Sequence, residues 1–284
     1  MKKFRNVSNI VITAILFCWL FTACDSGQTQ SITILHTNDT HSQIDPIAEG
    51  KRDGNHAGYA RRMGLIHQER QNDPELLLFD SGDFLQGTPY FNFFHGRVEV
   101  DAFNRMGYDA ITLGNHEFDY GIDTLAAILQ DAQFEVLSAN YDVSNTPLEG
   151  IVKPYTIIRR KGIKIGVFGL GVNPKGLIAD KNFAPIRYLE PIPVAQEIAT
   201  LLKEKYGCEL VICLSHMGTF EHEEMVSDTQ LAKATTDIDI IIGAHTHKVV
   251  TNHYVENLKG DSIFLAQMGK SGVRLGKISL KMHE

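Results

Sequence analysis

The chain has 284 residues, of which 43% are hydrophobic and 21% are charged, and its formal net charge is −7. This composition is that of a globular protein, and the length allows one large or two small domains with a sizeable core. The acidic excess argues against a nucleic-acid polymer or an anionic membrane surface as the main partner, because both attract basic patches.

The beginning of the chain reads as an export signal rather than as part of the fold. Lys2, Lys3 and Arg5 precede an apolar stretch over residues 10–23, which is too short to span a bilayer comfortably and is typical of a signal peptide. A polar tether follows over residues 24–31. Residues 1–23 are therefore predicted to be a signal peptide, and residues 32–284 a single domain.

Strand-like and helix-like segments alternate through this domain. Strands are predicted over residues 32–35, 76–79, 110–113, 210–214 and 240–242, a hairpin over 155–160 and 164–170, and a half-buried strand over 273–282. Helices are predicted over residues 59–71, 92–106, 123–131, 192–206 and 221–235. The order indicates a mixed sheet system with helices outside. Cys208 and Cys213 are expected to be buried free thiols.

Five of the predicted strands are followed by short polar segments. These are Asp39-Thr40-His41, Gly82-Asp83, Gly114-Asn115-His116-Glu117, Ser215-His216 and Gly243-Ala244-His245-Thr246-His247. Strand ends in an open α/β sheet line up along one edge, so these segments are predicted to converge in one crevice. Polar turns after strands are common in α/β proteins, but turns alone do not need this set of histidines and aspartates.

The residue types in these segments are metal ligands. Carboxylate, amide and imidazole donors without a thiolate suit Mn, Zn, Fe or Ni in a five- or six-coordinate site, rather than a structural zinc. Asp83 has two carboxylate oxygens and is the natural bridge between two cations. A pair of divalent ions about 3.5–4 Å apart would activate a bridging water and stabilise the leaving oxygen of a phosphate ester. The pattern therefore predicts a two-metal hydrolase.

The longer segments around these residues resemble the calcineurin-type metallophosphoesterases, and within them the 5'-nucleotidase branch. They are LHTNDTH (residues 35–41), GDFLQGTP (82–89), LGNHEFDYG (113–121), LSHMG (214–218) and GAHTH (243–247). The resemblance covers essentially all of the chain after the signal, in order. It implies an α/β fold in which two mixed sheets form a four-layer α/β/β/α sandwich with flanking helices.

The resemblance also implies roles for individual residues. One metal would be held by Asp39, His41, Asp83 and His247, and the other by Asp83, Asn115, His216 and His245. His116 matches the catalytic histidine, which can contact the phosphoryl oxygen or protonate the leaving alkoxide, and Asp119 matches the carboxylate that orients it. Glu117 lies within the same motif and is assigned no catalytic role.

The end of the signal, Phe21-Thr22-Ala23-Cys24, resembles a bacterial lipoprotein signal, in which the cysteine is acylated. An acylated Cys24 would make the protein an exported lipoprotein, in the periplasm or at the cell surface. Its only contact with the membrane would then be the lipid anchor.

The predicted activity is dinuclear-metal hydrolysis of a phosphorylated small molecule. The leading candidate is 5'-nucleotidase cleavage of a nucleotide. Enzymes that share such a site are the alternatives: a 2',3'-cyclic nucleotide phosphodiesterase, a nucleotide-sugar hydrolase or a thiosulfohydrolase. A non-catalytic metal-binding assembly subunit is the alternative of another class, and it would not need His116 and Asp119. The resemblance further suggests either a separate nucleoside-binding C-terminal domain protein as partner, or a less selective phosphoesterase.

Overall fold

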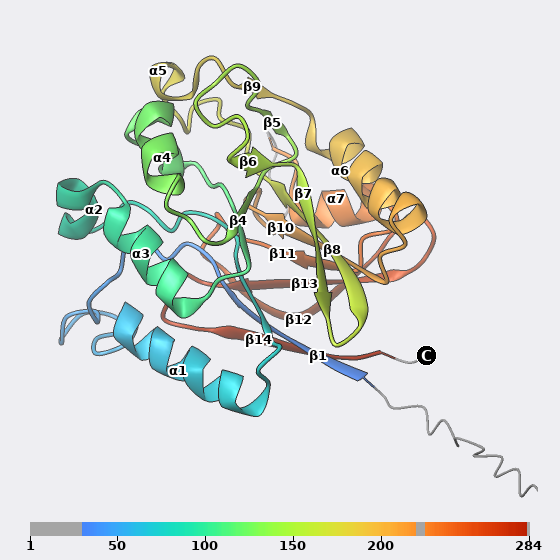
Figure 1. The fold of residues 1–284 in the computed structure, drawn as a ribbon, viewed down its shortest axis with the longest axis horizontal. Helices are drawn as coiled ribbons and strands as arrows, with labels where there is room; N and C mark the ends of the chain where they lie inside the picture. The colour runs from blue at the N-terminus through green and yellow to red at the C-terminus, as the bar shows by residue number, and fades with distance from the viewer. Residues whose placement is uncertain (1–29, 220–224, 283–284) are drawn as a thin grey trace, which may run out of the picture.

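The computed structural model describes residues 30–219 and 225–282, and Figure 1 shows their arrangement. The predicted signal peptide and Cys24 lie outside the described residues. The first of two six-stranded sheets has the strand order β14-β1-β2-β3-β4-β6. Its strands are β14 (Gly276–Met282), β1 (Gln30–Thr37), β2 (Leu77–Asp80), β3 (Ala110–Thr112), β4 (Glu135–Leu137) and β6 (Val152–Lys153). β1 pairs parallel with β2 and antiparallel with β14, so this sheet is mixed.

The second six-stranded sheet has the order β12-β13-β11-β10-β8-β7. Its strands are β12 (Val249–Glu256), β13 (Ser262–Met268), β11 (Ile240–Ile242), β10 (Leu210–Ser215), β8 (Ile163–Leu170) and β7 (Tyr155–Arg160). The four inner strands run parallel, and the edge strands β7 and β12 run antiparallel to their neighbours. Two short strands, β5 (Tyr141–Asp142) and β9 (Arg187–Tyr188), form a separate pair.

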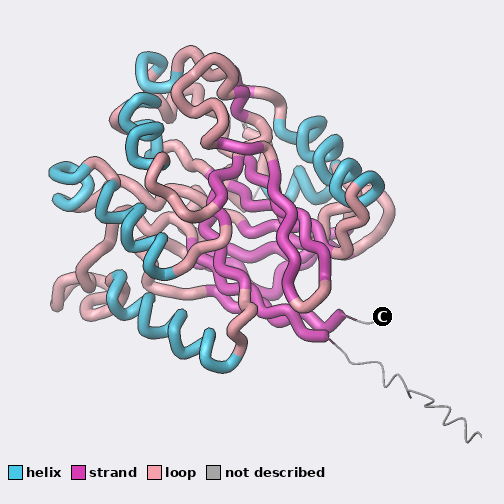
Figure 2. Tube along the Cα trace, in the orientation of Figure 1, coloured by secondary structure: helices cyan, strands magenta, loops and turns pink. Residues whose placement is uncertain are grey.

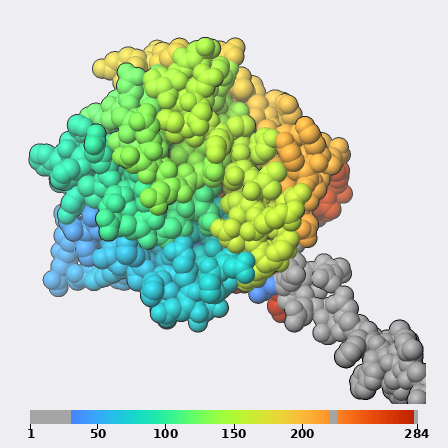
Figure 3. All heavy atoms as spheres, viewed as in Figure 1, coloured from blue at the N-terminus to red at the C-terminus, as the bar shows by residue number. Residues whose placement is uncertain are grey.

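The helices lie on the outer sides of the two sheets (Figures 1 and 2). They are α1 (Tyr59–Asn72), α2 (Pro89–Phe94), α3 (Arg97–Met106), α4 (Gly121–Leu129), α5 (Asp180–Phe183), α6 (Pro191–Thr200) and α7 (Asp228–Ala234), with a 3₁₀ turn η1 (His116–Phe118) and a π-helical turn η2 (Leu201–Lys205). Seen as spheres, the side chains of α1, α3, α4 and the β7–β8 hairpin close into one continuous surface (Figure 3).

Three hydrophobic clusters separate four layers. The central cluster joins the sheets, with Ile34 and Phe79 from the first and Ile212 from the second. An outer cluster packs the other face of the first sheet against α1, α3 and α4, and another packs the second sheet against α6 and α7. This arrangement follows from the alternation of side chains along each strand. The predicted four-layer α/β/β/α sandwich of two mixed sheets is confirmed.

The predicted hairpin is present with the expected turn. β7 and β8 pair antiparallel, and Lys161 and Gly162 between them take left-handed φ angles of 49° and 82°. Two such residues form the turn whose twist matches that of the strands. Cys208 and Cys213 are buried and free, as expected.

Several predicted helix boundaries are wrong. The helix predicted over residues 92–106 is two helices, α2 and α3, because His95 and Gly96 take left-handed φ angles of 53° and 99°. The helix predicted over 221–235 begins only at Asp228, where the Ser227 hydroxyl accepts the N–H of Gln230 in a capping box. Its predicted residues 221–224 lie outside the described chain. The helix predicted over 192–206 changes to π-helical geometry at Leu201.

Candidate metal centre

The polar segments after β1, β2, β3, β10 and β11 meet at one end of the two sheets, as predicted. Contacts between the sheets hold them together: the Ser81 hydroxyl donates to the Ile242 carbonyl at 2.7 Å, and His216 Nδ1 lies 2.7 Å from the Ser81 carbonyl. The segments that carry the predicted ligands therefore share one rigid frame.

The backbone at this end is unusual. Five of the seven predicted ligands, Asp39, His41, Asp83, His245 and His247, have φ angles between 45° and 69°. The left-handed region is unfavourable for residues with a Cβ, and such residues concentrate at functional sites. Gly82 has a φ of 88°, and a Cβ there would lie 2.6 Å from the Gly114 nitrogen. Glycine at this position is therefore required for the loops after β2 and β3 to touch.

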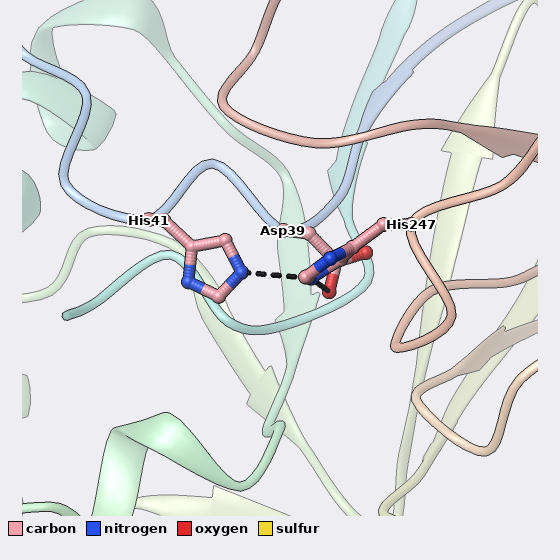
Figure 4. Close-up of side chains that lie close together, drawn as sticks. All are labelled: Asp39, His41 and His247. Atoms are coloured by element: carbon pink, nitrogen blue, oxygen red, sulfur yellow. Dashed lines mark hydrogen bonds and ion pairs between the residues drawn. The ribbon is translucent and has the colours of Figure 1, made fainter. Parts of the chain in front are cut away.

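One group of potential ligands consists of Asp39, His41 and His247 (Figure 4). His41 Nε2 lies 3.0 Å from His247 Nε2, and His247 Nε2 lies 3.5 Å from Asp39 Oδ1. Asp39 is fully buried, and its two oxygens each accept the backbone N–H of His245 at 3.1 Å. The three side chains come from the ends of β1 and β11, which lie far apart in the sequence.

The second group consists of Asp83, His216 and His245. His216 Nε2 lies 3.1 Å from Asp83 Oδ2 and 4.0 Å from Asp39 Oδ1, which links this group to the first. Nδ1 of His216 faces the Ser81 carbonyl, and this contact fixes the ring with Nε2 toward the carboxylates. Burial opposes a charge on His216, but Asp83, Asp39 and Glu117 outweigh it and raise its pKa to about 10.

Asn115 lies beside the second group, since the N–H of His116 donates to Asp83 Oδ1 at 2.9 Å. Asn115 Oδ1 is buried and makes no hydrogen bond, whereas His216 Nε2 has the Asp83 carboxylate as its polar neighbour at 3.1 Å. Buried polar atoms without a partner are costly, and a cation is the partner that suits this set of carboxylate, imidazole and amide donors. The residues present therefore fit a pair of divalent metal ions. The bridging role of Asp83 stays a prediction, because Asp83 groups with only the second set.

His116 and Asp119 lie at the edge of the two groups. His116 Nδ1 lies 3.1 Å from Asp119 Oδ2, and the rings of His116 and His41 are 5.5 Å apart. Burial lowers the pKa of His116, but the hydrogen bond to Asp119 and the charge of Asp83 outweigh this, and the pKa is raised overall. His116, His41 and His247 line a hollow of about 260 Å³. His116 is thus placed where it can contact a ligand.

Glu117 was not predicted to have a role, and the structure gives it a positioning one. Its buried carboxylate accepts the backbone N–H groups of Gly114 at 2.6 Å, Asp83 at 2.9 Å and Leu85 at 3.2 Å. Burial and the nearby Asp83 raise the pKa of Glu117 to about 8. Glu117 therefore fixes the loops after β2 and β3 to one another. Its position in the Asn-His-Glu motif was the only sequence signal for it.

The loop after β13 also reaches the centre and was not singled out by the sequence. The N–H of Ser271 donates to the Asp39 carbonyl at 2.7 Å, and the Asn38 amide donates to the Gly269 carbonyl at 2.8 Å. Lys270 and Ser271 line the hollow beside His116.

Among the helices of the described chain, none is long and apolar enough to cross a membrane.

Comparison with known proteins gives consistent matches. The model of the calcineurin-like phosphoesterase family matches residues 32–249. A snake venom 5'-nucleotidase from Gloydius brevicauda is 34% identical over 247 residues, which are 84% of this chain and 40% of that protein. A trifunctional nucleotide phosphoesterase from Bacillus subtilis is 31% identical over 285 residues, covering 89% of this chain and 18% of that protein.

Among solved structures, that of a 5'-nucleotidase precursor from Thermus thermophilus superposes with a TM-score of 0.80 and 31% identity. The match covers 89% of this chain and 52% of that one. The chain therefore spans about half or less of the length of these relatives.

Proposed function

The chain belongs to the calcineurin-like phosphoesterase family, whose members use divalent metals to hydrolyse phosphate esters, and we propose that this protein hydrolyses a nucleotide at a two-metal centre. The observation that carries the proposal is the pair of ligand groups, joined by the 4.0 Å approach of His216 to Asp39, with His116 and Asp119 at their edge.

We assign the ligands as the motifs predict. One ion would be held by Asp39, His41, Asp83 and His247, and the other by Asp83, Asn115, His216 and His245. When bound, two such ions supply Lewis acidity toward the phosphoryl group and lower the pKa of water. The donor chemistry supports Mn, Zn, Fe or Ni.

The residues of the chain itself would orient the ester and move one proton. His116 turns Nδ1 to the Asp119 carboxylate, so its Nε2 is the nitrogen available to the substrate. Hydrolysis adds water across the phosphorus–oxygen bond and gives phosphate and an alcohol. His116 Nε2–H is the proton source for the leaving oxygen, and Asp119 stabilises the charged imidazole before transfer. Glu117 holds Gly114 and Asp83 in place during this step.

A nucleotide is the proposed substrate because the relatives are named 5'-nucleotidase and nucleotide phosphoesterase. Within the described chain, no Phe, Tyr or Trp side chain lines the hollow beside His116. A base gains much of its affinity from aromatic stacking, so we propose that a separate nucleoside-binding domain protein completes the site. Adding that partner should lower the KM for a nucleotide far more than the KM for an aryl phosphate.

The test is hydrolysis of 4-nitrophenyl phosphate and a panel of nucleotides by the purified protein, with Mn, Zn, Fe or Ni added and metal content measured. We expect turnover that needs divalent metal and is abolished by a chelator. If the protein binds two equivalents of metal but hydrolyses none of the esters with any of these metals, it is instead a non-catalytic metal-binding subunit.

We further propose that the protein is exported and held at a membrane by acylation of Cys24. Cys24→Ser should release the chain from the membrane fraction or block its processing. Mass spectrometry of the unmutated protein should find lipid on the mature N-terminus, and a fully soluble protein without lipid mass would contradict the proposal.

A further inference from the structure

A second and larger hollow, of about 570 Å³, opens beside the candidate metal centre. Four cationic residues line it, namely Arg52, Lys248, Lys270 and Arg274, against one carboxylate, Asp53. The chain as a whole carries a net charge of −7, so the cationic lining of this hollow is opposite in sign to the net charge of the molecule. A hollow of this size lies within the range of small-molecule sites, about 300–1,000 Å³.

Most of these charges have no counter-ion among residues 30–219 and 225–282. Arg52 lies 4.0 Å from Asp53, whereas Lys248, Lys270 and Arg274 form no ion pair within the described chain. Cations close by in the sequence do pair: Lys259 with Asp237 at 2.8 Å and Lys277 with Glu69 at 2.7 Å. Like charges gathered in one hollow repel one another, so the arrangement favours an anionic ligand.

The basic hollow adjoins the candidate metal centre. Gln43, His247, Lys270 and Ser271 line both this hollow and the smaller one that holds His41 and His116. His247 belongs to the first ligand group, and Lys270 stands between the two spaces. A ligand at one of the two hollows therefore lies next to the other.

The loop that carries Lys270 and Arg274 is fixed in place. Gly269, Ser271 and Gly272 take left-handed φ angles of 77°, 58° and 60°, and Ser271 N–H donates to the Asp39 carbonyl at 2.7 Å. Beneath Gly272 lies the fully buried guanidinium of Arg62, which leaves no room for a Cβ there. A loop held this way presents its cations at set positions relative to Asp39, which lowers the entropic cost of binding.

We propose that the basic hollow binds a second phosphoryl group of the substrate, next to the one that is hydrolysed. The preferred substrate would then carry at least two adjacent phosphoryl groups, as a nucleoside diphosphate does. This rests on the proposed function, because the first phosphoryl group lies at the metal centre. Lysine and arginine give charge-assisted hydrogen bonds to phosphate, and arginine does so through two parallel bonds. For a nucleoside diphosphate, water adds to the terminal phosphorus at the metal centre and the bridging phosphorus–oxygen bond breaks. The products are inorganic phosphate and the nucleoside monophosphate, whose phosphoryl group is the one that the basic hollow binds.

The first test compares kcat/KM for adenosine 5'-diphosphate with that for adenosine 5'-monophosphate. In the double variant Lys248→Gln/Arg274→Gln, the diphosphate-to-monophosphate ratio should fall by about 10- to 100-fold, since each lost charge-assisted bond contributes up to about tenfold. Lys51→Gln is the matched control: it removes one exposed charge from the same surface without lining the hollow, and should leave the ratio unchanged.

The second test measures binding without turnover, by calorimetry of the metal-loaded protein with methylenediphosphonate and with methylphosphonate. The diphosphonate should bind more tightly to the wild-type protein, and this difference should shrink in the double variant and at high salt. Equal relative affinities in the wild type and the double variant would overturn the proposal. The proposal would also be overturned if the double variant lost affinity equally for the two phosphonates and for inorganic phosphate. That result would indicate a site for a separate anion. Failure to hydrolyse any ester would overturn the proposed function alone, because the binding measurement does not depend on turnover.

Discussion

Asp83 makes more contacts within the candidate centre than its predicted role as a metal ligand requires. Its Oδ2 lies 3.1 Å from His216 Nε2, its Oδ1 accepts the N–H of His116, and its own N–H donates to Glu117. Asn115 has no such connections through its side-chain oxygen. Asp83 therefore supports the segment around His116, in addition to its proposed role as a ligand.

The Asp83→Ala variant should consequently lose more bound metal than Asn115→Ala, together with essentially all activity. Metal content by elemental analysis and turnover of an aryl phosphate measure the two effects, and circular dichroism controls for folding. If the wild-type protein binds at most one equivalent of any transition metal, the two-ion assignment is wrong.

His116 is expected to act on the substrate without holding metal. The His116→Ala variant should retain both metals and lose about 10²–10⁴-fold in turnover, the usual contribution of a general acid or base. Asp119→Asn should lose less, because Asp119 acts through its contact with His116 Nδ1. Turnover at the wild-type rate in the His116 variant would remove this residue from the mechanism.

Among the helices, α7 shows how a local interaction decides a boundary. The Ser227 hydroxyl accepts the N–H of Gln230, and the Gln230 side chain accepts the N–H of Ser227. The Ser227→Ala variant should lower the free energy of unfolding by about 1 kcal/mol, the usual cost of losing such a cap. Urea denaturation measures it. Gln230→Ala should cost less, because Gln230 supplies only the second half of the box, and no change in either variant would contradict this account of the helix start.

The strands and their polar ends were predictable because short apolar runs with β-branched residues carry the signal locally. Ile240–Ile242 and the ligands that follow it are an example. The break between α2 and α3 was missed because His95 adopts a left-handed φ that its residue type does not announce. Glu117 and Lys270 were missed for another reason: their roles depend on segments brought together only in the folded chain, such as the approach of Ser271 to Asp39. Sequence patterns show which residue types are available, whereas the pairing of distant segments decides which side chains come into contact.

The stability of the complete fold should depend on pH through His36 in β1. This ring is fully buried against Gly276 of β14, and burial lowers its pKa to about 4. Because the pKa in the unfolded chain is higher, at about 6.5, the unfolded chain takes up the proton first as the pH falls. The stabilising contribution is thus complete above about pH 6.5 and is lost as the pH falls toward 4.

Between pH 7 and pH 5 the loss from His36 should be on the order of 2 kcal/mol, from the difference in the two pKa values. Urea denaturation at the two pH values measures it, and the His36→Phe variant should show a smaller pH dependence. His67→Gln, at an exposed position of α1, is the control and should behave like the wild type. An identical pH dependence in the wild type and the His36 variant would contradict the account.

The two ends of β1 lie at opposite sides of the molecule: the strand starts at Gln30 and leads to the candidate metal centre. Gln30 lies opposite Met282 at the start of β1, whereas Asp39 follows the other end of the same strand. Nine residues at about 3.3 Å each separate these points by roughly 30 Å. A surface, a bead or a neighbouring protein attached at Gln30 would therefore hold the molecule at the end opposite the candidate centre. The candidate centre lies at the other end of β1, so immobilisation through Gln30 should leave the hollow beside His116 accessible to a small molecule.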